Sequence, residues 1–436
     1  MTNGEMYKKE YFKELLIVAL LLMAYAINIP FLILTSFALA CFLVVFSKDQ
    51  KSVYYLAFFT SFAGIFVYQG RHMFFVMVAL FILKTLVKNR INRETVAFYF
   101  VILTYSILFS DVRSGFSFAK MIGLILLFAI PSIAELADKF DCRIFLQNYI
   151  FGFLVATVIG FFVKSFPSMY RLFEVDLIWT EKFQEVTRFF GLAYDSNFYA
   201  LSNYLILAYL LFAFEKITPF RGLLILFLLI SGLMTISKSY FLITGFLFIL
   251  YLVNNISKMK RMMAFILAAV IGVWAFSIVS SILGYNVIEL IQSRFIPDGS
   301  FSDNTTGRTD IWKEYMNLFQ TSGAKEFLFG FGFNAKVLHA AHNTLIEFIY
   351  HYGIAGLILW GAYFRHCFKL FQKNTVGFVN KSPVVCFCLV IGIFFLSAYT
   401  YEAFWIGVVI SLMTLGKQSK GEEASHVQYN SANLQG

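Results

Sequence analysis

Apolar runs long enough to cross a membrane follow one another along almost the whole chain. A spanning helix needs about 20 apolar residues, and about fourteen runs of roughly this kind can be read, at 12–28, 31–47, 52–69, 72–88, 95–110, 117–135, 143–165, 198–215, 219–236, 238–253, 262–284, 343–364, 384–398 and 402–416. The breaks at 28–30 and 399–401 are weak, so either flanking pair could be one long broken helix. The sequence predicts an all-α, polytopic membrane helix bundle of about 12–14 transmembrane helices, forming a single domain over 1–416.

The charged residues fix an orientation for these runs. With the N-terminus inside, Lys and Arg gather in the short inner loops, as positive-inside topology requires. Both termini are then cytoplasmic, and two long polar loops, about 166–197 and 285–342, lie outside. Residues 417–436, rich in Ser, Asn, Gln and Glu, read as a disordered cytoplasmic tail. The net charge of +10 therefore indicates membrane topology and no nucleic-acid partner.

Composition and spacing exclude several kinds of chemistry. Only 14% of the residues are charged, against 59% hydrophobic. No carboxylate stands in the middle of an apolar run, where ion-coupled transporters usually keep one. The five cysteines, including the Cys386-x-Cys388 pair, read as buried and reduced. P-loops, serine hydrolase motifs and zinc spacings are absent, so we expect no metal and no cofactor.

The second outer loop carries an arginine beside a predicted helix. Apolar positions from Thr309 to Phe319 suit an amphipathic helix on the membrane surface, with Thr309 as its cap. Arg308 would then precede a helix N-terminus, which favours anions, and its planar fork matches phosphate oxygens. The alternative is a solvated or snorkelling arginine. The glycines of Gly330-x-Gly332 read as a tight turn.

His342 ends this loop, immediately before a long apolar run. Thr344-x-x-Glu347 fits a capping box, so the helix would begin near Asn343 or Thr344. The dipole there favours a neutral imidazole, which can accept a proton as a general base. If the helix begins a turn earlier, His342 and Gly353 share one helix face instead. A hydrogen-bonded surface histidine is the plainer alternative, and His351 looks like a packing position.

Two further places in the outer region carry polar residues at helix starts. Asp195 or Asn197 could cap a helix, and Asp195 could equally orient a sugar hydroxyl. Lys238 follows an outer turn at Thr235-Ile236-Ser237, where it could contact a headgroup or a pyrophosphate, or simply snorkel.

Taken together, these residues resemble the O-antigen ligase and O-antigen polymerase superfamily of bacterial membrane glycosyltransferases. The family pattern of His-Asn, nine residues, Gly, two residues and Gly is met by His342-Asn343, Gly353 and Gly356. Gly307-Arg308 with Trp312, Gly330-x-Gly332 and Tyr194-Asp195-Ser196-Asn197 also look like family features. The resemblance covers roughly 188–364. One departure is Ser237-Lys238, where many members have Ser-Arg.

The resemblance implies a metal-independent transfer of glycan from undecaprenyl diphosphate on the outer face of the bacterial cytoplasmic membrane. His342 would activate the acceptor hydroxyl, and Arg308 and Arg294 would bind the donor diphosphate. Lys238, Asp195, Asn197 and Asn343 would contact substrate. We expect a polymerase of O-antigen, capsule or exopolysaccharide, with a chain-length regulator and a flippase as possible partners. The alternatives are an O-antigen ligase and, from another class, a polysaccharide or lipid-linked oligosaccharide exporter.

Overall fold

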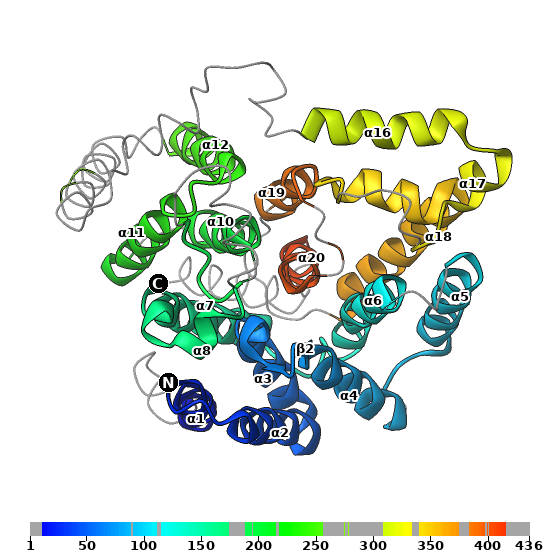
Figure 1. Cartoon of the computed structure of the whole chain (residues 1–436). Helices are drawn as coiled ribbons and strands as arrows, with labels where there is room; N and C mark the ends of the chain where they lie inside the picture. The colour runs from blue at the N-terminus through cyan, green and yellow to red at the C-terminus, as the bar shows by residue number, and fades with distance from the viewer. Residues whose placement is uncertain are drawn as a thin grey trace, which may run out of the picture.

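The protein is mostly helical, as expected for an all-α chain (Figure 1). The computed structural model describes residues 11–88, 90–110, 115–173, 188–193, 195–214, 218–255, 274, 278, 308–333, 340–374, 383–396, 399 and 401–415, without the side chains of 115–119 and 164. Its long helices are α1 (Phe12–Ala26), α2 (Pro30–Phe46), α3 (Asp49–Thr60), α4 (Phe74–Val87), α5 (Arg93–Phe109), α6 (Gly115–Ala134), α7 (Cys142–Phe161), α10 (Ser196–Phe212), α11 (Pro219–Leu233), α12 (Lys238–Asn254), α16 (Arg308–Thr321), α18 (Thr344–Asn374), α19 (Pro383–Ile393) and α20 (Glu402–Leu415). The short elements are η1 (Ala63–Ile65), β1 (Val67–Tyr68), β2 (Arg71–His72), η2 (Val163–Ser165), α8 (Pro167–Tyr170) and α17 (Ala324–Phe329).

Helix α20 lies at the centre of the bundle. It packs against α19, α6, α10, α18 and α3 (Figure 1). Every residue from Ala403 to Ser411 is buried, with Trp405 fully so. A helix that is apolar on all sides has no preferred outer face, so enclosure by other helices is its stable position.

The two weak breaks separate distinct helices. Asn28 adopts φ +53, and Pro30 starts α2 at a position where its missing N–H costs nothing. The last pair is likewise split into α19 and α20. The third run was expected to continue to 69, but α3 ends at Thr60. A two-stranded hairpin, β1–β2, follows it and provides the only backbone pairing between strands in the described part of the chain.

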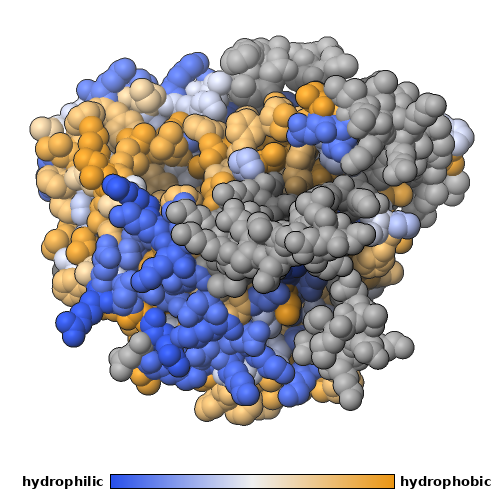
Figure 2. Space-filling view, turned by 180° about the vertical axis from the view of Figure 1, so that it is seen from behind, coloured by the Kyte–Doolittle hydropathy of each residue, from blue (hydrophilic) through white to orange (hydrophobic). Residues whose placement is uncertain are grey.

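Large apolar side chains are exposed on the outside of the bundle. Those at least 70% exposed are Phe12, Phe31, Phe46, Val87, Phe100, Leu108 and Ile358. On the face shown in Figure 2, hydrophilic residues gather at the lower left, with hydrophobic residues above and below them. Among the described helices, Cys142–Phe161 and Thr344–Asn374 are long and apolar enough to cross a membrane, with mean hydropathy of 1.8 and 1.4. The other apolar helical stretches with described side chains, such as Lys120–Ala134 of α6, are shorter, so 12–14 spans stays a prediction.

A polar network joins the loops at one end of the bundle. The Lys84 ammonium donates to the carbonyls of Val44, 3.2 Å away, and Ser47, 2.6 Å away. Lys88 donates to Asp49 at 2.8 Å. Burial alone would raise the pKa of Asp49, but the bond and charge of Lys88, with Lys84 and Arg90 nearby, hold it below its ordinary value. The exposed cations at this end include Lys48, Lys51, Arg93, Arg143, Arg365, Lys369 and Lys373.

Candidate active site

A close crossing of two glycine-containing backbone segments shapes the N-terminal half of α18. Gly353 interrupts the helix with φ +59 and ψ −167, and Gly330 and Gly332 also have positive φ. The backbone of the 330–332 turn runs against this break: Phe331 N–H donates to the Tyr350 carbonyl at 2.7 Å. A Cβ on Gly330 would lie 2.5 Å from the carbonyl carbon of His351. Only glycine fits such close contact between backbones. This confirms the tight turn at 330–332 and explains why glycine stands at position 353.

The break excludes one predicted placement of His342. A continuous helix beginning a turn earlier would have put His342, Gly353 and Gly356 on one face. The helix instead begins at Thr344 and breaks at Gly353. His351 is a packing residue as expected, with its Nδ1 2.7 Å from the Gly332 carbonyl oxygen.

Helix α16 packs on the first half of α18. Tyr315 lies edge-on to Tyr350, with ring centroids 5.1 Å apart, and Phe331 stacks on Tyr350 at 4.8 Å. Ile311, Leu318 and Phe319 complete this second apolar cluster. The apolar face was expected to lie on the membrane surface, but most of it is used for protein packing. Met316, 53% exposed, points away from the cluster.

The residue before His342 is held from two sides. Trp312 Nε1 donates to the Ala341 carbonyl at 2.7 Å, and the Ala341 N–H donates to Glu347 Oε1 at 3.3 Å. Ala341 is fully buried, whereas His342 is half-buried with φ +48. A left-handed conformation at a non-glycine residue costs energy and persists only where neighbours impose it. Residues 340–343, here called the His342 loop, are therefore held in place by α16 and α18.

The start of α18 differs from a capping box. Asn343 is the cap, because its Oδ1 accepts from the Ile346 N–H at 3.1 Å. The predicted start near Asn343 or Thr344 is confirmed, but Thr344 donates its hydroxyl to the Leu396 carbonyl. Glu347 reaches Ala341, not the backbone of Thr344. The Asn343 oxygen therefore has a structural task, and its contact with substrate stays a prediction.

Arg308 is the first residue of α16 and is half-buried. The helix includes both Arg308 and Thr309, so Thr309 is not its cap. Arg308 and Trp312 are four residues apart, a spacing that puts two side chains on the same helix face one turn apart. Since Trp312 bonds to Ala341, Arg308 belongs to the same packed unit as the His342 loop.

A second polar group connects the starts of α10 and α12. We call Arg188, Asp195, Asn197, Thr235 and Ser237 the Asn197 cluster. Asn197 Oδ1 accepts from the Ser237 hydroxyl at 2.8 Å and from Arg188 Nη2 at 3.2 Å. Arg188 Nε also donates to the Thr235 carbonyl at 2.8 Å. Asp195 caps α10 by accepting from the Asn197 N–H at 2.6 Å, so the capping interpretation is confirmed.

Lys238 extends this cluster. It is the half-buried first residue of α12, and it follows Ser237, which is fully buried and bonded to Asn197. Ile236, with φ +48, forms the turn before it. Asp195 and Asn197 at the start of α10 therefore lie beside the start of α12, where Lys238 follows Ser237.

The connection between α19 and α20 links the two groups. Tyr399 stacks near Phe348 of α18, with ring centroids 4.6 Å apart. Tyr401 lies against Phe198 of α10 at 4.2 Å. The His342 loop and the Asn197 cluster therefore flank this connection, with α19 between α12 and α18 (Figure 1).

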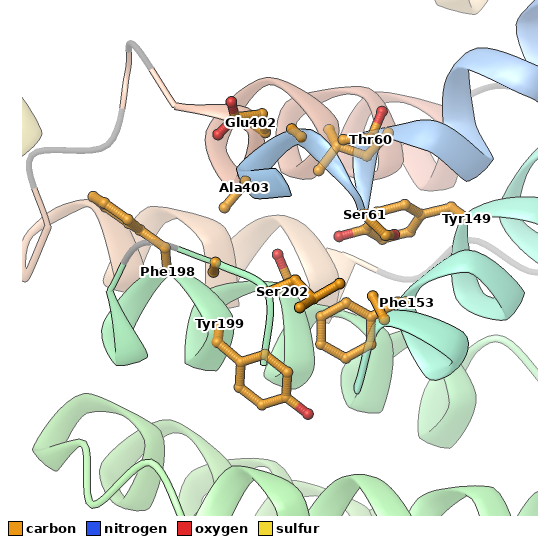
Figure 3. Close-up of a pocket in the computed structure, with 15 residues that line it drawn as sticks. Thr60, Ser61, Tyr149, Phe153, Phe198, Tyr199, Ser202, Glu402 and Ala403 are labelled. Atoms are coloured by element: carbon orange, nitrogen blue, oxygen red, sulfur yellow. The ribbon is translucent and has the colours of Figure 1, made fainter. Parts of the chain in front are cut away.

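Other predicted features lie elsewhere. Arg294, the run at 262–284 apart from 274 and 278, and the tail at 417–436 lie outside the described residues. A cavity of about 50 Å³, lined by Ser61, Tyr149, Ser202 and Glu402 among others, opens between α3, α7, α10 and α20 (Figure 3). It has room for a few waters but not for a sugar ring, and no predicted site residue lines it.

Three polar residues near the site were not predicted to take part. The sequence showed Arg188 as a charge in the first predicted outer loop, but it did not show that Arg188 would bond to Thr235. Glu347 was assigned to a cap. The Lys120 ammonium lies 5.7 Å from the Tyr399 ring centroid. A lone cation near the end of an apolar run is a signal that the sequence did offer. In the described part of the chain, no three His, Cys, Asp or Glu residues group as metal ligands, and all five cysteines are free.

Comparisons with known proteins leave the family open. No family model matches the chain, and neither a curated protein nor a solved structure matches it. The site geometry is therefore the basis for any functional conclusion.

Proposed function

We propose that this chain is a membrane-embedded polysaccharide polymerase of the O-antigen ligase and polymerase superfamily. It would transfer a growing glycan from undecaprenyl diphosphate onto a lipid-linked repeat unit. The exposed apolar side chains around the bundle support a lipid environment, since a soluble protein rarely exposes so many. The cations gathered at one end of the bundle favour that end as cytoplasmic.

The observation that carries the proposal is the link from α16 to the His342 loop. Trp312 holds Ala341 at 2.7 Å, and Arg308 lies one turn earlier on the same helix. A candidate base and a candidate phosphate ligand, 34 positions apart in sequence, thus belong to one rigid unit. Such fixed separation is what a transfer reaction needs, because positioning lowers its barrier.

The chemistry then follows from the two side chains. An acceptor hydroxyl attacks the anomeric carbon of the donor sugar, and the bond from that carbon to the diphosphate oxygen breaks. His342 takes the hydroxyl proton. Arg308 neutralises charge on the departing undecaprenyl diphosphate. The diphosphate is already a good leaving group, so these two functions suffice.

The direct test uses purified protein and a synthetic undecaprenyl-diphosphate repeat unit. We expect a ladder of polymer without added metal or nucleotide, and no ladder from His342→Asn. Asparagine is chosen because it tolerates positive φ. A ladder of equal strength from the variant would remove His342 from the mechanism.

Deletion of the gene separates the three candidate activities. A polymerase deletion leaves single lipid-linked repeats outside the membrane. Loss of a ligase leaves lipid-linked polymer, and loss of an exporter traps repeats inside. Accumulated polymer or internal repeats would contradict the proposal.

A further inference from the structure

Glu347 is a buried carboxylate directly beside the His342 loop. Its side chain is 2% exposed, and one oxygen accepts the Ala341 N–H at 3.3 Å. Its other oxygen, Oε2, is buried and has no hydrogen-bond partner among the described residues. Leaving a carboxylate oxygen unpaired inside a protein is costly. Sites that keep such a group against stability are commonly functional.

The position of Glu347 relates it to His342 through one residue. Its carboxylate contacts the backbone nitrogen of Ala341, and the His342 imidazole begins a few bonds further along the chain. Standard bond lengths put the carboxylate on the order of 10 Å or less from the imidazole. At that separation a charge in a partly buried region still changes the pKa of an imidazole.

We propose that Glu347 is a positioning residue for His342. It holds the His342 loop through Ala341, and in its ionised form it favours the protonated imidazole that forms when His342 accepts the acceptor proton. This inference rests on the proposed function. It adds a carboxylate partner to the base, acting through the backbone and through space and not as a contact to substrate.

The titratable and charged groups around Glu347 come from several elements. Tyr315 of α16 and Tyr399 of the α19–α20 connection lie nearby, and burial raises the pKa of both phenols, so both stay neutral. Lys120 of α6 lies over the Tyr399 ring, and Arg308 is one turn from Trp312. A cation near His342 would oppose its protonation, and a carboxylate such as Glu347 acts in the opposite direction.

Glu347→Gln should change the pKa of His342 in one direction. A nearby carboxylate raises the imidazole pKa, so Glu347→Gln lowers it. His342 acts as a base in its neutral form, so the rising limb of the kcat/KM profile moves to lower pH, by about half a unit to one unit. A less basic imidazole also lowers the plateau, by about two- to threefold, while KM is unchanged because Glu347 does not contact substrate.

The experiment measures His342 directly in the full-length protein. The protein holds six histidines, so their ring carbons are labelled with ¹³C and titrated by NMR in nanodiscs, with His342→Asn assigning the signal. Glu347→Gln is isosteric and buries a neutral amide in place of a charge, so its melting temperature should not fall. Glu326→Gln on α17, which removes a carboxylate without contact to Ala341, is the matched control and should leave the His342 pKa unchanged.

Each outcome has one meaning. A lower His342 pKa in Glu347→Gln alone, together with the shifted kcat/KM profile, supports the inference. An unchanged pKa overturns it, whatever the activity. A wild-type protein that makes no ladder contradicts the proposed function, but the titration still decides whether Glu347 acts on His342.

Discussion

The His342 loop and the Asn197 cluster hold their candidate residues in different ways. In the first, backbone and aromatic contacts fix the shape. The backbones of Gly330 and Gly353 lie in close contact, and Trp312 donates a hydrogen bond to the Ala341 carbonyl. These contacts hold the loop at Ala341 and at the glycines, through residues other than His342. In the second, Asn197 is itself the centre of the structure, because Arg188 and Ser237 both bond to its oxygen.

This difference decides what a mutation can reveal. A residue held by its surroundings can be changed without collapse, so a loss of activity reports its chemistry. A residue that holds its surroundings reports stability and function together. We therefore expect clean functional effects at the His342 loop and mixed ones at the Asn197 cluster.

The largest effect should come from the glycine crossing. Gly353→Val adds a branched side chain where φ is +59 and where a Cβ would meet the Leu328 carbonyl oxygen at 2.5 Å. Strain and overlap together should cost about 3 kcal/mol or more. We expect a large fall in the melting temperature in detergent and loss of polymer.

Gly361→Ala is the control on the same helix. Gly361 has no heavy atom within 4 Å of its missing Cβ, and alanine is favoured over glycine in helices by about 0.5–1 kcal/mol. Its melting temperature should hold or rise. If both variants melted like wild type, the backbone crossing would not be what shapes the site.

The next effect is on activity alone. His342→Asn should lower kcat by roughly 10²–10⁴, the usual contribution of a general base, with an unchanged melting temperature. The half-buried imidazole can be lost without opening the packed Ala341 beneath it. An equal loss of stability and activity would show that His342 supports the fold, and the contrast between the two regions would fail.

The sequence identified the elements better than the contacts between them. Periodicity predicted a helix at 309–319, where α16 runs from Arg308 to Thr321, and cap residues predicted the start of α18 to within a residue, because those signals are local. The packing of α16 was not predicted, since an amphipathic face looks the same whether it lies against lipid or against α18. Only tertiary packing distinguishes Tyr315, turned inward, from Met316, left exposed.

The same limit applies to the site. His342, Arg308 and the Asp195 cap could be predicted because each stands beside a helix start. The link from Glu347 to Ala341 was missed because a glutamate three residues after a threonine already had a local explanation. The joining of Arg188 to Thr235, 47 positions apart, has no local signal at all.

Changes at Asn197 should have smaller effects than those at Gly353 and His342, and they should lower stability and activity together. Asn197→Ala removes the acceptor used by Arg188 and Ser237, and unpaired buried groups cost about 1–3 kcal/mol. We expect both the melting temperature and polymer yield to fall. Ser237→Ala removes one donor and leaves Arg188 in place, so its loss should be milder. A normal melting temperature in Asn197→Ala with lost activity would instead make Asn197 a direct substrate contact.

The smallest effect should come from Lys238→Arg. Lysine keeps the positive charge but presents a single ammonium, whereas arginine offers a planar fork that binds phosphate oxygens in pairs. If Lys238 contacts the donor diphosphate, arginine should lower KM for the lipid-linked donor a fewfold, with kcat and melting temperature unchanged. Lys238→Met, which keeps the length without the charge, should raise KM by more than arginine lowers it. Donor KM values that stay the same in both variants would place the diphosphate contacts on the α16 side alone, and the Asn197 cluster would then serve the acceptor or the fold.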